Sequence, residues 1–444
     1  MTCWVPLFLN LVRSRRPSFL PRQIPQYFCR YSTTSDRNLI HSFPTNGFGH
    51  VSLEDKFEEE NLPKYHAERF YPVRIGDVYN DCYQILAKLG FGTTSTIWLC
   101  RDVRQDAFLT MKVCATEVNS DSSVDNELSV SQYLESIEAE HPGKNFLRLI
   151  VDHFLLQGAV GNHQCLLFTP LGLNFTQLRN RFPEKAVPKL LVQHTMQILL
   201  IGFDFLHQVG VVHTDISPNN LLLGLTDTAV LSEIEQSELE NPSYRKTLPD
   251  RTIHMSHKMP VTGGMPKICD FGAARIGAEH SGDVMPGQYR APEVILGMKW
   301  DSKIDIWAIA LTTWDLLQGN YLFNASKDGL LHDERHLAEM VSLMGPPPKA
   351  FLERSEDCRK YWDDEAGNWI AETPIPDQSL ETRNKHFSGE DGRLLLEFMR
   401  KIVRWLPEER PTAEDLYKDA FIYQTPIGSS ARDGSDSTDP MRYK

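Results

Sequence analysis

The chain has 444 residues, a formal net charge of −13, 41% hydrophobic residues and 10% aromatic residues. These values are typical of a globular protein large enough for a two-lobed enzyme, and they disfavour a disordered chain or a nucleic-acid binder. The eight cysteines form no Cys-x-x-Cys pair, so no zinc site or disulfide framework is indicated, and we expect a reducing, intracellular environment.

The first 35 residues differ in composition from the rest of the chain. Residues 1–35 contain no acidic side chain, and arginines lie among Leu, Phe and Ser residues. This composition is typical of a mitochondrial presequence. The alternative is a disordered tail that is not imported, with the protein in the cytoplasm or nucleus. Residues 36–82 are interpreted as an N-terminal extension, and residues 424–444, rich in Ser, Gly and Asp, as a disordered tail.

Strand-like and helical patterns occupy different parts of the chain. Three runs rich in β-branched and aromatic residues, at 83–90, 95–103 and 107–115, predict antiparallel hairpins. A helix is expected at 123–138, further strands near 147–154 and 165–169, and mainly helices after about Gly172. The apolar stretches 189–207 and 303–317 predict buried core helices, and no transmembrane segment is expected. The whole pattern predicts an α+β fold of two lobes with a cleft between them.

The sequence "LGFGTTSTIW" lies within the first predicted hairpin. Gly90 and Gly92 would let the backbone approach a phosphate closely, and the amides between them can donate to its oxygens. The alternative is an ordinary hairpin turn, for which paired glycines are also common. The loop by itself therefore leaves both interpretations open.

Charged residues downstream add chemistry to this loop. Lys112 lies in the middle of a predicted strand, where an ammonium group needs a partner, and Glu127 on the next helix can supply one. The alternative is a lysine that reaches solvent at the edge of the strand. Farther along, "VHTDISPNN" brings Asp215 and Asn220 onto one loop, and "KICDFG" brings Asp270 to the end of a strand. Each of these segments could also be a turn whose side chains cap the local backbone.

Taken in order, these segments match the motif set of protein kinases. The set runs from a glycine loop through a strand lysine, a helix glutamate, His-x-Asp with a later Asn, and Asp-Phe-Gly to "APE" at residues 291–293. The chain resembles the eukaryotic protein kinases over 83–423, with an N-lobe at 83–169 and a C-lobe at 170–423. Within that group it is similar to the SR-protein kinases and their fungal relatives. The specific matches are "YPVRIGD", "FGTTSTIWL", "HTDI", "QYRAPEV", "DIWAIA", "GNYLF" and "PEERPTAEDL".

The resemblance implies an ATP- and Mg²⁺-dependent, non-specific serine/threonine protein kinase of bilobal fold that acts on protein substrates as a monomer. It implies catalytic roles for Lys112, Asp215 and Asn220, and Mg²⁺ ligation by Asn220 and Asp270. It implies ATP contacts by Leu89, Gly90, Phe91, Gly92, Thr93, Thr94, Ser95, Ile97, Thr110, Lys112, Glu127, Phe168, Leu171 and Leu222. It also implies a Glu293–Arg410 ion pair that braces the C-lobe, and a long insert at 224–266 that we expect to be mobile.

Several positions depart from the family pattern. Ser217 stands where serine/threonine kinases carry a lysine, Thr110 where an alanine usually lies over adenine, and Pro286 and Gly287 where a Thr-Arg pair is usual. Losing one charge-assisted contact costs about 1.5–3 kcal/mol, which would slow the enzyme without inactivating it. The alternatives are a pseudokinase that binds ATP with little or no turnover and, at a greater distance, a small-molecule kinase.

Two further departures concern regulation and substrates. Thr214 occupies the position of an arginine that would bind an activating phosphate, and Ser281 is the only serine or threonine between Asp270 and Glu293. We therefore expect activity that does not require phosphorylation of this segment. Arg335 and Ser342 stand where the docking groove of SR-protein kinases is expected to be acidic, which disfavours arginine-serine repeats as substrates.

Overall fold

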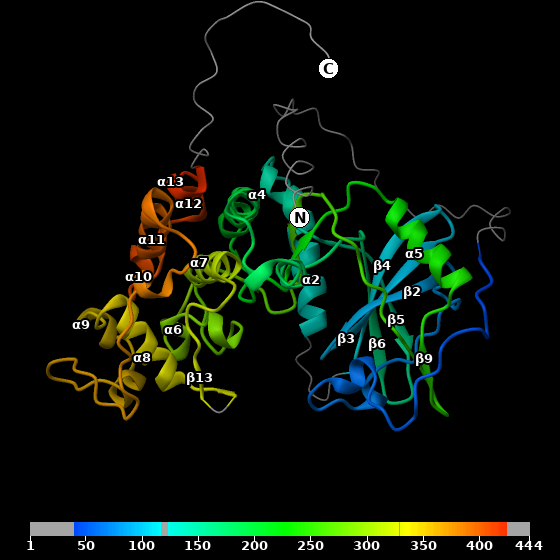
Figure 1. Cartoon of the computed structure of the whole chain (residues 1–444), viewed down its shortest axis with the longest axis horizontal. Coiled ribbons are helices and arrows are strands. Elements are labelled where there is room, and N and C mark those ends of the chain that lie inside the picture. The colour runs from blue at the N-terminus through cyan, green and yellow to red at the C-terminus, as the bar shows by residue number, and fades with distance from the viewer. Residues whose placement is uncertain (1–39, 117–122, 328, 424–444) are drawn as a thin grey trace, which may run out of the picture.

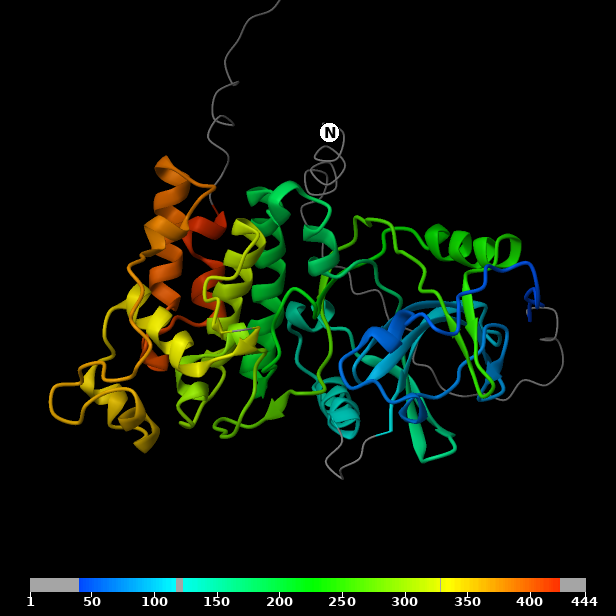
Figure 2. The ribbon, with the colours of Figure 1, turned by 60° about the horizontal axis from the view of Figure 1, so that its bottom comes forward.

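The computed structural model describes residues 40–116, 123–327 and 329–423 (Figure 1). A β-sheet and a group of helices occupy opposite ends of the molecule, and both views show this division (Figures 1 and 2). The predicted two-lobed α+β architecture is thereby confirmed. The predictions for residues 1–35 and 424–444 concern segments outside the described residues.

The N-lobe contains a six-stranded antiparallel sheet in the order β1-β2-β3-β4-β6-β5. Its strands are β1 (Val78–Tyr79), β2 (Tyr83–Gly92), β3 (Ser95–Asp102), β4 (Ala107–Cys114), β5 (Ile150–Gln157) and β6 (Asn162–Phe168). The first three predicted runs form β2, β3 and β4, which pair in sequence as hairpins. The predicted helix is α2 (Ser123–Ser136), which contacts β5 and lies on the side of the sheet that faces the helical lobe (Figure 1).

The insert at 224–266 folds against the sheet, and the prediction of a mobile insert is wrong. It contains α5 (Ala229–Glu240) and a hairpin of β9 (Arg245–Thr247) and β10 (Thr252–His254). Leu231 and Ile234 of α5 are buried in one cluster with Leu86 of β2 and Leu99 of β3. The insert therefore belongs to the N-lobe, although its sequence lies between two segments of the C-lobe.

Buried acidic residues explain why the insert resembles a solvent-exposed segment in the sequence. The inner face of α5 repeats at helical spacing, but two of its four buried positions are Glu235 and Glu238. Glu235 forms an ion pair with Arg101 of β3. Burial by itself would raise the pKa of Glu238. Hydrogen bonds, among them those with His257 (2.7 Å) and Arg245 (3.0 Å), outweigh burial and lower the pKa below its ordinary value. Because Arg101 of the sheet pairs with Glu235, while His257 and Arg245 of the insert hydrogen-bond to Glu238, this acidic helix can be buried.

The N-terminal extension connects the insert to the strand that leads into the glycine loop. Lys88 of β2 is fully buried and forms an ion pair with Glu59. The neighbouring Glu60 forms an ion pair at 2.8 Å with Lys246 of β9. A short 3-10 helix, Glu58–Asn61, thus bridges the sheet and the insert.

Replacing Leu231 by alanine tests whether the insert packs on the sheet. Leu231→Ala should lower the free energy of unfolding by about 2–3 kcal/mol, because it leaves a cavity beside Leu86 and Leu99. Urea denaturation measures the change, and the exposed neighbour Ser232→Ala serves as control, with an expected change within about 0.5 kcal/mol. Equal stability of the two variants would show that α5 is not docked.

The C-lobe is mainly helical. Its helices are α3 (Phe175–Arg179), α4 (Lys189–Gln208), α6 (Pro292–Ile295), α7 (Lys303–Gln318), α8 (Asp333–Met344), α9 (Lys349–Leu352), α10 (Leu380–Arg383), α11 (Gly389–Ile402), α12 (Ala413–Tyr417) and α13 (Ala420–Tyr423). Two-stranded ladders join β7 (Val211–Val212) to β12 (Arg275–Ile276), β8 (Leu221–Leu223) to β11 (Pro266–Ile268), and β13 (Ser326–Lys327) to β14 (Leu330–Leu331). Every residue of α7 from Ile304 to Gln318 is buried, which confirms the predicted core helix.

Within the described part of the chain, one stretch, Pro183–Gln208, is long and apolar enough to cross a membrane by length and composition alone. Half of its most apolar window is buried inside the protein. It includes α4, which packs against α7, α12 and α13. These contacts favour the predicted core helix.

Candidate active site

The glycine-containing segment forms the turn between β2 and β3. Phe91 pairs with Thr96 and Gly92 with Ser95, which leaves Thr93 and Thr94 exposed at the tip. A Cβ added at Gly90 or Gly92 would meet no atom within 4 Å, and neither residue has a positive φ. The fold itself therefore does not require glycine at these positions. A phosphate group has room to approach this backbone, whereas the side chain of Ser95 is buried.

The residues predicted to surround adenine share one face of the sheet with the lysine. Thr110 and Lys112 alternate in β4 and therefore point to the same side. Ile97 of β3 lies opposite Lys112, and Phe168 of β6 lies opposite Thr110. This face thus presents an ammonium group beside apolar side chains.

The segment that follows β6 is hydrogen-bonded to the C-lobe. The amide of Gly172 donates to the carbonyl of Leu223 at 2.7 Å, and the amide of Leu223 donates to the carbonyl of Leu173 at 2.9 Å. Leu171 and Leu222 belong to these two connected segments, and Leu222 is half-buried. Leu89 is partly buried against the cluster that contains Leu173.

Lys112 lies between two carboxylates. Its Nζ is 2.8 Å from Oε2 of Glu127 on α2 and 3.5 Å from Oδ1 of Asp270. Burial opposes the charge on Lys112, but these carboxylates raise its pKa above the ordinary value, so the ammonium is retained. The predicted Lys112–Glu127 pair is confirmed, and Lys112 in turn lowers the pKa of Asp270. The three side chains come from the sheet, from α2 and from the segment after β11.

Asp215 and Asn220 lie on the loop between β7 and β8. Nδ2 of Asn220 donates to Oδ2 of Asp215 at 2.7 Å and to the Asp215 carbonyl at 2.8 Å. Both side chains are half-buried, so they remain accessible to a reactant. Burial is the main cause that raises the pKa of Asp215 above its ordinary value, and nearby Asp270 adds to it. A carboxylate in this state is a better proton acceptor than a fully solvated aspartate.

A buried aspartate of α7 fixes the backbone of this loop. Asp305 is fully buried and accepts hydrogen bonds from the amides of His213 (2.8 Å) and Thr214 (2.9 Å). Thr214 has a φ of 67°, a left-handed conformation that costs a non-glycine residue energy unless its surroundings hold it. Asp305 lies in the "DIWAIA" segment, but no local sequence pattern predicts its contact with this loop.

Asn126 is a second positioning residue that the sequence analysis missed. Its Nδ2 donates to the carbonyls of Gly272 and Ala274, both at 2.9 Å. It thereby ties α2 to the segment that carries Asp270, and it lies next to Glu127. Its adjacency to the predicted glutamate was the only signal in the sequence.

Two of the unusual residues lie in the loop itself. Ser217 is buried, and its carbonyl accepts a hydrogen bond from the amide of Asn220 at 3.0 Å. Oγ1 of Thr214 donates to the carbonyl of Ala273 at 2.9 Å, which links the loop to the segment after Asp270. Neither residue offers a positive charge, as the sequence predicted.

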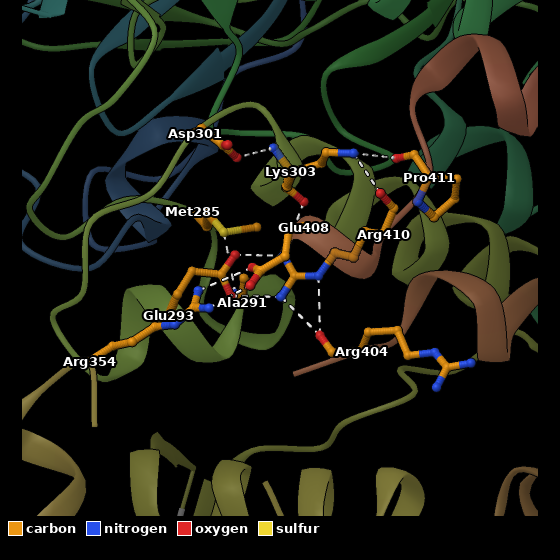
Figure 3. A network of polar contacts seen from close by, with 10 residues as sticks. All are labelled: Met285, Ala291, Glu293, Asp301, Lys303, Arg354, Arg404, Glu408, Arg410 and Pro411. Carbon is orange, nitrogen blue, oxygen red and sulfur yellow. Dashed lines mark hydrogen bonds and ion pairs between the residues drawn. The ribbon is translucent and has the colours of Figure 1, made fainter. Parts of the chain in front are cut away.

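The predicted Glu293–Arg410 pair is confirmed as a bidentate ion pair (Figure 3). The distances are 2.5 Å and 2.7 Å, and both side chains are buried. The guanidinium also donates to the carbonyls of Arg404 and Lys303 and lies 4.9 Å from the Trp307 ring centre. Its donors are thereby satisfied, as a buried charge requires.

The donor set suits a nucleotide with a hard cation. Among the described residues no group of three or more His, Cys, Asp and Glu side chains could enclose a metal on its own. Magnesium does not need such a group, because proteins commonly hold it through one or two oxygen ligands together with substrate phosphates. The carboxylate of Asp270 and the amide oxygen of Asn220 are ligands of this kind, and Lys112 is a cation for phosphate oxygens.

This fold, with a strand lysine paired to a helix glutamate and an aspartate loop below it, defines a protein kinase. The chain belongs to the protein kinase family, because the protein kinase domain matches residues 83–422. The crystal structure of a kinase domain aligns with this structure at a TM-score of 0.61 and 22% sequence identity. The alignment covers 80% of this chain and 99% of the kinase domain, and it supports the fold.

Relatives of known class refine this assignment. A serine/threonine protein kinase of Aspergillus fumigatus is 37% identical over 385 residues, which cover 85% of this chain and 94% of the relative. The serine/threonine-protein kinase SRPK of Physarum polycephalum is 29% identical and covers 83% and 92% of the two chains. Protein kinase dsk1 of Schizosaccharomyces pombe is 25% identical, with 81% and 84% covered. The chain is a serine/threonine protein kinase similar to the SR-protein kinases. The alternatives of a pseudokinase and a small-molecule kinase gain no support.

Proposed function

We propose that the chain uses ATP and Mg²⁺ to phosphorylate Ser and Thr hydroxyls of protein substrates through the residues described above. The observation that carries the proposal is the joining of Lys112 to both Glu127 and Asp270, next to an accessible Asp215–Asn220 pair. Lys112 would bind the α- and β-phosphates, and Asn220 with Asp270 would hold Mg²⁺, which would neutralise phosphate charge. Residues 90–95 would cover the phosphates.

The chemical step would need positioning more than covalent catalysis. The acceptor oxygen forms a bond to the γ-phosphorus while the bond from that phosphorus to the bridging oxygen breaks, and ADP leaves. Asp215 accepts the proton of the acceptor hydroxyl. Asn220 orients the Asp215 carboxylate through its hydrogen bond.

Phosphate transfer to a generic basic protein tests this function directly. With ATP and Mg²⁺ present, labelled phosphate should appear on Ser and Thr residues, and chelation of Mg²⁺ should abolish the transfer. ATP–Mg²⁺ should also raise the melting temperature by mass action. Thermal stabilisation without any transfer would show a nucleotide-binding protein without this activity.

Phosphorylation of the segment after Asp270 should not control the rate. Ser281→Ala should keep transfer within about twofold of the wild type, because Thr214 offers no charge to bind a phosphate there. The rate is measured on dephosphorylated protein, with intact mass confirming the phosphorylation state. A strict requirement for phospho-Ser281 would contradict the prediction.

Substrate class, assembly and location extend the proposal. Arg335 of α8 lies where an acidic residue was expected, so we propose substrates other than arginine-serine repeats.

We propose that the protein is a monomer, and size-exclusion chromatography with light scattering tests this. Mitochondrial import remains a prediction from residues 1–35. Fractionation of cells tests it, because an imported protein should be found in the mitochondrial fraction in a shortened form.

A further inference from the structure

The C-lobe contains a groove with a volume of about 1190 Å³. Its walls come from α3, the 3-10 helix Pro183–Lys185, the end of α7, the segment 319–324, α8 and the segment 372–385. We call it the C-lobe groove. None of the proposed catalytic residues lines it. Its volume exceeds the range of about 300–1,000 Å³ that is common for small-molecule sites, so a protein segment suits it better.

The C-lobe groove adjoins the end of the segment between Asp270 and Glu293. Oη of Tyr289 donates to Oδ2 of Asp315 at 2.5 Å, and Asp315 lines the groove. Leu331, just before α8, lies against Gly287. A Cβ added to Gly287 would be 3.1 Å from Cδ1 of Leu331. A substrate that reaches the candidate active site along this segment can therefore continue into the groove.

The carboxylates on the inner walls already have partners. Asp315 is buried and bound by Arg179 as well as by Tyr289. Glu339 accepts a hydrogen bond from the amide of Asn324 at 2.6 Å and pairs with Arg335 at 3.3 Å. The amide of Thr373 donates to Glu334 at 2.5 Å. Glu372 is exposed on the rim and has no such partner among the described residues.

Three cations of the C-lobe groove form no ion pair with a carboxylate among the described residues. Lys185 and Lys385 are exposed and form no ion pair with a carboxylate within the described part of the chain. The guanidinium of Arg383 donates to the Tyr321 carbonyl (2.7 Å) and to Oε1 of Gln378 (3.0 Å), which are neutral acceptors. Nε2 of Gln378 is a buried donor with no acceptor in the described protein. Five cations and four carboxylates line the C-lobe groove, which therefore carries a net positive charge in addition to the unused donor of Gln378.

We propose that the C-lobe groove docks an acidic segment, rich in Asp and Glu, of the protein substrate. The proposal rests on the proposed kinase function and names a feature of its substrates. Carboxylates would form charge-assisted hydrogen bonds with Arg383, Lys185 and Lys385 and would accept from Gln378. An arginine-rich segment would meet the same cations and be repelled.

Peptide binding to the full-length protein tests this docking. A fluorescent peptide of alternating Glu and Gly should bind at least tenfold more tightly than its Lys-Gly counterpart, and more weakly as salt is raised. Lys185→Glu/Lys385→Glu should reduce the affinity for the acidic peptide at least tenfold. The matched control, Lys349→Glu/Lys418→Glu, makes the same charge change at exposed lysines outside the groove and should change the affinity less than twofold. An equal loss in both double variants, or preference for the Lys-Gly peptide, would overturn the proposal.

A second measurement separates docking from catalysis. Wild-type transfer to a short Ser peptide is compared with transfer to the same peptide carrying the Glu-Gly extension, which should have a KM at least fivefold lower. The Lys185→Glu/Lys385→Glu variant should remove that difference. Transfer to both peptides with equal KM would refute docking and leave the kinase function intact. Binding of the acidic peptide without any transfer would refute the kinase function and leave docking intact.

Discussion

Asp215→Asn should reduce kcat for phosphate transfer about 10²–10⁴-fold, which corresponds to about 3–5 kcal/mol of transition-state stabilisation. The amide keeps the size of the side chain but cannot accept the proton of the acceptor hydroxyl. The hydrogen bond from Asn220 to the Asp215 carbonyl does not involve the replaced group, so the loop should keep its conformation. Radiolabel transfer to a generic basic protein under saturating ATP–Mg²⁺ gives kcat.

The control for this variant is Asp364→Asn, which makes the same chemical change at a surface aspartate that pairs with Arg359. It should transfer phosphate at the wild-type rate. Thermal stabilisation by ATP–Mg²⁺ should persist in Asp215→Asn, which separates a loss of chemistry from a loss of binding. More than a tenth of wild-type kcat in Asp215→Asn would show that another group accepts the proton.

Arg410→Met should lower the free energy of unfolding by about 3–5 kcal/mol. The substitution leaves the buried carboxylate of Glu293 without its partner, and an uncompensated buried charge is strongly destabilising. It also removes the donors that the carbonyls of Arg404 and Lys303 accept from (Figure 3). Urea denaturation, with the midpoint and slope analysed together, measures the loss.

A nearby exposed pair provides the matched control. Arg354 pairs with Glu408, and the two side chains are 38% and 58% exposed. Arg354→Met should therefore cost less than about 1 kcal/mol, because solvent screens such pairs. The double variant Glu293→Gln/Arg410→Met should recover part of the lost stability, since no unpaired charge remains. Similar losses in Arg354→Met and Arg410→Met would contradict a special role for the buried pair.

The sequence alone determined the class of fold and the residues of the candidate active site. Strand and helix patterns have their own periods, and the glycine, lysine, aspartate and asparagine motifs occur in a fixed order along the chain. They identified Lys112, Glu127, Asp215 and Asp270, which the structure brings to one place, and the resemblance to protein kinases implied the buried pair in the C-lobe.

Only the tertiary structure decided how the acidic insert and the supporting residues are used. Glu235 of α5 has the sequence pattern of a solvated residue, but it is buried and pairs with Arg101, which lies 134 residues away in the sequence. Asp305 fixes the loop from 91 residues beyond Thr214, and Asn126 reaches Gly272 across 146 residues. Burial and ion pairing depend on partners that are distant in sequence, and local patterns carry no information about those partners. For the same reason the sequence does not predict the C-lobe groove, whose charged residues come from α3, α7, α8 and residues 372–385.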